Sequence, residues 1–348
     1  MDRVYSCQFS TRLKLSSIGN VVPVNGNVVP VKINKVIKIL ILSSPKRMNS
    51  LAATASSTGD RDRVHSLGDL SLEDHWITLN GSRMRYLRSG SGPAVLLLHG
   101  LLGYSFSWRY TIPVLARQNT VHAVDMLGVG FSDRPAGLDC SLKAAAERLL
   151  LFLDSVGVES CDLLGTSHGG AVAMMAAALA PQRIRRLILV APVNPWSQKG
   201  KRMAAFLSSP IVAPIFLRTA PLMEITHEYL LRRLYGDTRR IRPGTLEGYS
   251  APFAQPGAFH YGLSILRTWK QDLRELESML PRISNIPALL LWGSVDAAVI
   301  PASADPLSKQ FKNCRVQIFD GVGHLPYEEV PEEFNQAVAE FLASDRNV

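Results

Sequence analysis

Short apolar segments alternate with stretches of helical periodicity through most of the chain. Continuous apolar runs of about five residues are typical of strands that are buried on both faces, as in a parallel sheet. Such runs occupy residues 94–98, 121–126, 161–164, 186–191 and 288–292, and residues 315–319 form a more polar sixth. Residues 141–156 and 332–342 repeat apolar side chains at helical spacing. The alternation predicts an α/β fold with a mostly parallel central sheet and helices on both faces.

Two departures from this pattern define the expected domains. Near the start, residues 76–79 and 83–88 flank Asn80-Gly81, a pair that favours a tight β-hairpin. After Pro192 the strands stop until Ala288, and the intervening segments 203–207, 226–235 and 261–280 are helical and rich in aromatic residues. We therefore expect a core of residues 68–192 and 288–348, interrupted by a helical cap (residues 193–287) over the carboxyl ends of the strands.

The charge of the chain is concentrated at its beginning. Of the net +9, residues 1–59 contribute eight Lys and Arg against one acid, so the remainder is close to neutral. This distribution argues against nucleic-acid binding. We expect residues 1–67 to be a basic, disordered extension on a cytoplasmic protein. We also expect that the protein does not insert stably into a membrane. Three alternatives stay open: an organellar transit peptide, since the leader is basic and poor in acids; a secretory signal, whose apolar region would normally lie nearer the start; and a translation start at Met48.

The composition offers no sign of a metal or cofactor. The four cysteines, Cys7, Cys140, Cys161 and Cys314, are widely separated and form no C-x-x-C motif, so neither a metal site nor a disulfide framework is expected. Gly128 and Gly130 follow a strand but do not open a helix with the spacing of a dinucleotide-binding loop. We expect no cofactor and no metal.

The most informative stretch is Gly165-Thr166-Ser167-His168-Gly169, which separates an apolar strand from an Ala-rich helix. The glycines permit a sharp reversal of the chain, and the serine would lie at the apex, at the start of the helix. Free N–H groups at that helix start can bind an oxyanion. By itself the motif more often marks a glycine-containing turn, which Ser167 would cap, than a nucleophile.

Two titratable residues follow in the order that this turn requires. Asp296 lies just past the strand at 288–292, and His324 lies just past the strand at 315–319. Active sites of parallel α/β sheets lie at the carboxyl ends of strands. Either residue alone could be structural, Asp296 as a helix N-cap and His324 as a loop histidine. Their occurrence in the order Ser167, Asp296, His324 indicates a catalytic triad.

Here the sequence resembles the α/β-hydrolase superfamily over residues 70–348. The matching positions are His99-Gly100, the Gly128-x-Gly130-x-Ser132 loop, the serine turn, the Asp296 turn and Gly323-His324. The resemblance implies that Ser167 is the nucleophile, His324 the general base and acid, and Asp296 the residue that orients the imidazole. It places the oxyanion hole at the backbone N–H groups of Leu101 and His168. Within the cap, Trp196, Phe206 and Trp269 are candidates for substrate contact.

The segment Ser105–Arg109 and the cap look like the epoxide hydrolase and haloalkane dehalogenase branch. Those activities need a carboxylate nucleophile, and here the residue is Ser167. Hydrolases of carbon–carbon bonds keep the serine, but usually have a Gly-Pro-Gly loop and a tryptophan after the histidine; this chain has Leu101-Leu102-Gly103 and Leu325. We therefore expect a serine esterase, a monomer or homodimer acting on small to medium, largely apolar esters. The alternatives are a carbon–carbon bond hydrolase and a small-molecule receptor without turnover.

Overall fold

The computed structural model describes residues 63–67, 70–197, 206–219 and 224–344 of the chain. Most of the expected basic extension and most of the helix expected at 203–207 lie outside these ranges. All described residues belong to one compact unit, Asp60–Val348.

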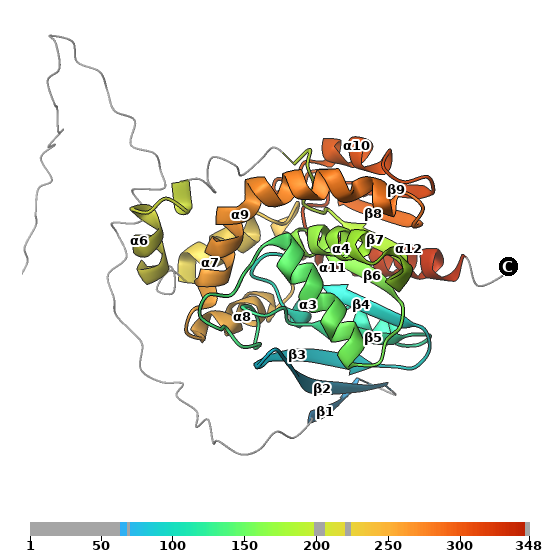
Figure 1. Cartoon of the computed structure of the whole chain (residues 1–348), viewed down its shortest axis with the longest axis horizontal. Helices are drawn as coiled ribbons and strands as arrows, with labels where there is room; N and C mark the ends of the chain where they lie inside the picture. Colours follow the sequence, from blue (N-terminus) through green and yellow to red (C-terminus); the bar gives the residue numbers. More distant parts are fainter. Residues whose placement is uncertain (1–62, 68–69, 198–205, 220–223, 345–348) are drawn as a thin grey trace, which may run out of the picture. The chain divides into compact units, whose positions relative to one another are not determined.

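A nine-stranded sheet, ordered β1-β2-β3-β5-β4-β6-β7-β8-β9, forms the centre of this unit (Figure 1). The pairs β1–β2, β2–β3 and β3–β5 are antiparallel, and every later pair is parallel. The predicted α/β class and mostly parallel sheet are thus confirmed. The strands are Arg63–Leu67 (β1), Leu70–Leu79 (β2), Ser82–Ser89 (β3), Ala94–Leu98 (β4), Thr120–Val124 (β5), Cys161–Thr166 (β6), Ile184–Val190 (β7), Ala288–Gly293 (β8) and Cys314–Phe319 (β9).

The first strands refine two expectations. Asn80 and Gly81 have φ of 49° and 81°, and Leu79 pairs with Ser82, so the predicted hairpin closes in a tight turn whose central residues both have positive φ. In contrast, Arg63–Leu67 pairs with β2 as a full strand. The folded part therefore begins earlier than residue 68, because backbone pairing recruits a polar strand that apolar periodicity does not reveal.

Side chains of the buried strands alternate between two apolar layers. Leu96, Leu163 and Leu290 face one layer, and Leu97, Leu164 and Leu291 face the other. The first layer is covered by α3 (Leu142–Ser155), α4 (His168–Leu179), the second half of α9 (Ala258–Met279) and α10 (Ala304–Ser308). The second is covered by α2 (Ile112–Leu115), α11 (Pro326–Glu329) and α12 (Pro331–Ala343). The continuous apolar runs in the sequence reflect this burial on both faces.

The cap follows β7 and precedes β8. Its described helices are α6 (Val212–Thr219), α7 (Glu224–Arg232), α8 (Thr245–Ser250) and the first half of α9. Phe259 and Tyr261 of α9 pack within the cap and against core loops, whereas Leu273 and Leu276 belong to the main core cluster. The helix α9 is therefore shared by cap and core, which anchors this end of the cap to the sheet.

Candidate active site

Ser167 occupies a sharp turn between β6 and α4. Its backbone has φ 53° and ψ −119°, a conformation that non-glycine residues rarely adopt. A Cβ on Gly165 would overlap the backbone of Gly169, and a Cβ on Gly169 would overlap the backbone of His99. The helix that follows is apolar all round and buried, so it cannot move away to relieve the turn. The glycines thus allow strand and helix to approach closely while the serine stays partly exposed at the apex.

Asp296 and His324 are in direct contact. The Nδ1 atom of His324 lies 2.7 Å from Oδ2 of Asp296, and both residues are buried. The other carboxylate oxygen, Oδ1, accepts hydrogen bonds from the backbone N–H groups of Ala298 at 2.7 Å and Val299 at 3.0 Å. With Oδ1 occupied in this way, Oδ2 is held toward the imidazole. The arrangement leaves Nε2 of His324 as the nitrogen available for proton transfer.

All three predicted residues lie at the carboxyl edge of the sheet. The backbone N–H of Ser167 donates to Val190 at the end of β7, and Ala191 in turn donates to Leu291 in β8. These bonds align the end of β6 with the end of β8, where the Asp296 turn begins. The structure therefore brings Asp296 and His324 into contact and places Ser167 at the end of a nearby strand.

The loop after β4 lies against the serine turn. A Cβ added to Gly100 would lie 3.2 Å from the Cβ of Ser167. Among the residues that the structure describes, no acceptor is bound to the backbone N–H of Leu101 or of His168. Leu102, with φ 58°, continues the loop in a strained conformation. Two N–H groups, one from the loop and one from the start of α4, are thus left without a partner near the serine, as an oxyanion site requires.

The two histidines beside the turn have structural contacts. His99 accepts a hydrogen bond on Nε2 from the backbone N–H of Met126 at 3.0 Å, and its Nδ1 lies 2.8 Å from the Gly100 carbonyl oxygen. It therefore braces the loop. Burial, together with the nearby His99, lowers the pKa of His168 to about 3, so this ring is neutral near pH 7. The His168 ring packs edge-on against Tyr261, with 6.3 Å between centroids.

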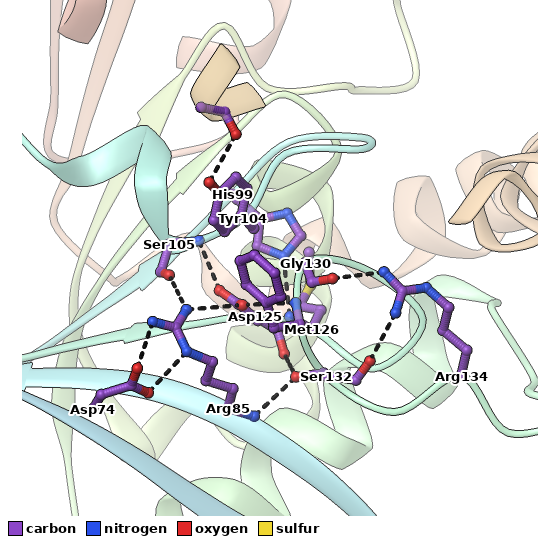
Figure 2. A network of polar contacts seen from close by, with 12 residues as sticks. Asp74, Arg85, His99, Tyr104, Ser105, Asp125, Met126, Gly130, Ser132 and Arg134 are labelled. Atoms are coloured by element: carbon purple, nitrogen blue, oxygen red, sulfur yellow. Dashed lines mark hydrogen bonds and ion pairs between the residues drawn. The ribbon is translucent and has the colours of Figure 1, made fainter. Parts of the chain in front are cut away.

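A buried polar network holds the loop after β5 in place (Figure 2). The carboxylate of Asp125 accepts from the backbone N–H of Ser105 at 2.8 Å and of Phe131 at 3.0 Å, and it pairs with Arg85 at 3.2 Å. Arg85 also forms two hydrogen bonds of 2.8 and 2.9 Å to Asp74. Burial alone would lower the pKa of Arg85, but the two carboxylates more than offset this and raise it. Sequence reasoning missed this network, because its members are separated by many residues and match no motif.

Ser132, which matched the family pattern, also supports this loop. Its hydroxyl donates to the carbonyl oxygen of Asp125 and accepts from the backbone N–H of Arg85 at 2.8 Å. Arg134 completes the turn by donating to the carbonyl oxygens of Gly130 at 2.6 Å and Ser132 at 3.3 Å (Figure 2). Ser132 thus braces the loop after β5.

Two acids beyond His324 connect the core to the cap. Glu328 forms a two-pronged ion pair with Arg109, with distances of 2.5 and 2.6 Å, and accepts from the hydroxyl of Tyr249 in α8 at 2.7 Å. The guanidinium of Arg109 also lies over the ring of Phe106, 4.0 Å from its centroid. Burial opposes the charge on Arg109, but the Glu328 carboxylate offsets this and raises the pKa of Arg109.

Glu329 binds three backbone N–H groups with its buried carboxylate. Gly323 donates at 2.7 Å, Gly236 at 2.9 Å and Asp237 at 3.1 Å. The backbone N–H of His324 itself donates to the carbonyl oxygen of Leu234, another cap residue, at 2.6 Å. The loop that carries His324 is thus bound directly to the cap. In the sequence, this contact is indicated only by the two adjacent acids, Glu328 and Glu329, shortly after His324.

The structure places the three cap candidates differently. Trp196 and Trp269 are half-buried and pack against the main core cluster. Phe206 has 59% of its surface exposed and lies on the outside of the cap. Tyr261, which the sequence did not single out as a site residue, lies against Gly128 and His168. Of these four aromatic residues, Tyr261 has the clearest contact with the serine turn.

Neither Asn194 nor Asp320 is placed to take the role of the triad acid beside His324. Asn194 is buried and donates through its amide to the Pro192 carbonyl oxygen at 2.9 Å and to Ser303 at 3.1 Å. Asp320 is exposed and accepts from the hydroxyl of Ser294. Within the described ranges, no group of three His, Cys, Asp or Glu side chains is arranged to hold a metal ion. None of the described helices has both the length and the apolar character needed to cross a membrane.

Comparison with known proteins agrees with this architecture. Residues 93–331 match the protein family described as the alpha/beta hydrolase fold. The chain belongs to the α/β-hydrolase family. The chain is 26% identical over 283 residues to 2-hydroxymuconate semialdehyde hydrolase of Pseudomonas sp. (strain CF600). The alignment covers 76% of this chain and 91% of that one.

Other members of the family differ in their reactions. The chain is 28% identical over 261 residues to the pimeloyl-[acyl-carrier protein] methyl ester esterase of Aeromonas hydrophila, covering 73% of this chain and 97% of that one. The crystal structure of haloalkane dehalogenase DbeA from Bradyrhizobium elkani superimposes with a TM-score of 0.69 at 27% identity, covering 79% of this chain and 98% of that one. Similarity therefore establishes the hydrolase family, and the choice of reaction depends on the residues of the site.

Proposed function

We propose that the protein is a serine hydrolase that cleaves carboxylic esters through an acyl-enzyme intermediate on Ser167. The observation that carries the proposal is the buried Asp296–His324 pair, 2.7 Å apart, at the same sheet edge as the strained Ser167. A dehalogenase or epoxide hydrolase of this fold needs a carboxylate at the position of Ser167. The nucleophile therefore favours acyl chemistry.

In the proposed reaction, Oγ of Ser167 attacks the ester carbonyl carbon while its proton passes to Nε2 of His324. The carbonyl oxygen becomes negative and is stabilised by the N–H groups of Leu101 and His168. Collapse of this intermediate breaks the bond to the alcohol, which takes the proton from His324. Water then attacks the acyl group and gives a proton to His324; release of the acid returns that proton to Ser167. Asp296 keeps the imidazole oriented and stabilises its charged form.

The surroundings of the turn favour apolar substituents. Leu101 packs with Val129, Tyr261 and Ile265 in a small apolar cluster, and Leu102 packs with Phe259 in another. Polar or charged acyl groups would lose hydration here without gaining partners. We therefore propose esters of small to medium, largely apolar groups as substrates.

The similarity to 2-hydroxymuconate semialdehyde hydrolase supports a second candidate, hydrolysis of a carbon–carbon bond. Both reactions are tested by assaying the full chain against p-nitrophenyl esters of increasing acyl length and against 2-hydroxymuconate semialdehyde. We expect steady ester turnover, and a loss of about 10⁴-fold or more in kcat for Ser167→Ala with an unchanged melting temperature. Turnover of the semialdehyde alone would favour the second candidate. A single stoichiometric release of product would favour a receptor. Retention of more than about a tenth of the ester turnover by Ser167→Ala would exclude the serine mechanism.

A further inference from the structure

Helix α6 of the cap is apolar on both sides. Its inner side contributes the buried Ala213, and Phe216 and Leu217 pack against Ala258 and Phe259 of α9. Its outer side is also apolar: Ile215 is 59% exposed, and before the helix Ile211 is 80% and Phe206 59% exposed. A helix at the surface of a protein normally presents polar side chains to water. We name the set Phe206, Ile211 and Ile215 the outer cap face.

Helix α7 also carries exposed apolar side chains. Both helices pack against Phe259, through Phe216 of α6 and His227 of α7. On α7, Tyr229 is 52% exposed and Leu230 is 55% exposed. Figure 1 shows both helices at the end of the cap that lies away from α12. Five large apolar side chains, Phe206, Ile211, Ile215, Tyr229 and Leu230, are thus exposed on or next to these two helices, which is typical of an interaction surface.

The charge of this region identifies the chemistry of the partner. Residues 196–223 contain no Asp or Glu, and Arg218 is exposed at the end of α6. The cap as a whole has 13 Lys and Arg against 7 Asp and Glu, whereas residues 60–192 and 288–348 together have 17 against 21. The cap is thus cationic and the core is slightly anionic. Among the described side chains of α6, of α7 and of the residue that follows α7, Arg218, Arg232 and Arg233 are exposed. An exposed acid of these helices, Glu228, pairs with Arg232.

From these features we infer that the outer cap face docks on the surface of an anionic lipid bilayer. Apolar side chains of a surface helix enter the boundary between headgroups and acyl chains, and Lys and Arg contribute by attracting anionic headgroups. Tyr229 has the amphipathic side chain that is enriched at such interfaces. A second copy of the chain fits less well, because two cationic faces would repel each other.

Docking would place the bilayer close to the candidate active site. The cluster that holds Phe216 and Leu217 also includes Leu102, the neighbour of Leu101 in the loop beside Ser167. One layer of side chains therefore separates α6 from that loop. This step rests on the proposed esterase function. Given that function, esters dissolved in the bilayer are the substrates that would reach the site from this face. Docking itself does not depend on catalysis.

The test is co-sedimentation of the full chain with vesicles, at physiological salt, using the catalytically silent Ser167→Ala background. Vesicles of phosphatidylcholine alone are compared with vesicles containing phosphatidylglycerol. Ile211→Ser/Ile215→Ser removes the apolar contact. The matched control is Val316→Ser/Ile318→Ser on β9, where the two side chains are 45% and 50% exposed. The basic leader is the same in every variant, so a difference in binding between variants comes from the cap and not from the leader.

We expect the anionic vesicles to bind the protein, the α6 double variant to bind at least tenfold more weakly, and the β9 variant to bind normally. Arg218→Glu should weaken binding to anionic vesicles only, and it provides a second measurement if the double variant folds poorly. Equal binding by the α6 and β9 variants would overturn the inference, as would equal binding to both kinds of vesicle. A shift from dimer to monomer in the α6 variant, with vesicle binding unchanged, would identify a second copy as the partner instead. Vesicle binding as expected, together with no ester turnover by the wild-type chain, would overturn only the proposed function.

Discussion

The backbone N–H of Gly323 donates a hydrogen bond of 2.7 Å to the carboxylate of Glu329. The same carboxylate accepts from Gly236 and Asp237 in the cap. Because Gly323 immediately precedes His324, one buried anion fixes both the loop of the candidate catalytic histidine and the cap segment packed on it. Glu329 is thus expected to act as a positioning residue.

Glu329→Ala should lower both stability and turnover. It leaves three backbone N–H groups without their acceptor, and the loss of hydrogen bonds to a buried charge costs about 3 kcal/mol or more in the free energy of unfolding. We expect kcat for ester hydrolysis to fall about tenfold or more, since His324 loses its fixed position. Urea denaturation and steady-state kinetics measure the two effects separately.

Glu329→Gln is the matched control, because it keeps one acceptor oxygen at the same reach. It should recover part of both losses. A purely structural role would appear as lost stability with normal kcat and KM at temperatures well below the melting transition. That result would contradict the positioning role.

Asp296→Asn tests the orientation of the imidazole. The amide would present a donor to Nδ1 of His324, which favours the wrong tautomer. We expect kcat to fall about 10⁴-fold, less than in Ser167→Ala, because the acid does not itself react. The triple variant of Ser167, Asp296 and His324 should be barely worse than Ser167→Ala, since the three residues act as a unit. Asp320→Asn, at an exposed acid, should keep normal kcat; a comparable loss there would reassign the acid.

The Arg109–Glu328 pair can be tested by a double-mutant cycle. Arg109→Met leaves the buried Glu328 carboxylate without its counter-ion and should cost about 3–5 kcal/mol in the free energy of unfolding. Adding Glu328→Gln removes that charge, so the double variant should be more stable than Arg109→Met. Chemical denaturation measures each free energy. Additive losses would mean that the two side chains act independently.

The buried His122 predicts sensitivity to acid. Burial, and secondarily the charge of Arg88, lowers the pKa of His122 to about 4. Between this value and the unfolded pKa of about 6.5, only the unfolded chain binds the proton, so stability falls as the pH falls through that range. At pH 5 the protonation of this residue in the unfolded chain lowers the free energy of unfolding by about 2 kcal/mol. His122→Phe should therefore reduce the drop in melting temperature between pH 7 and pH 5.

His260→Phe, at an exposed histidine, is the control for that measurement. It should leave the drop unchanged. If His122→Phe showed the same drop as the wild type, the acid sensitivity of the fold would have to come from other groups.

The sequence by itself determined the parts that depend on local physics. Continuous apolar runs predicted β4, β6, β7 and β8, because a strand buried on both faces must be apolar at successive positions. Asn80-Gly81 predicted its hairpin, because both residues tolerate positive φ. The glycines around Ser167 predicted the sharp turn. The order of Ser167, Asp296 and His324 along parallel strands predicted a shared sheet edge, since parallel strands all end on the same side.

Tertiary structure decided the features that join distant segments. Arg109 and Glu328 are separated by 219 positions, and Arg85 and Asp125 by 40, so no local pattern indicates that these charges meet. The strand β1 escaped prediction because its evidence is backbone pairing and not apolar periodicity. The position of Phe206 could not be predicted either, since an aromatic residue in a helical segment is equally compatible with both sides of the helix. Burial and pairing depend on which surfaces meet after the chain has folded, and only the folded arrangement specifies them.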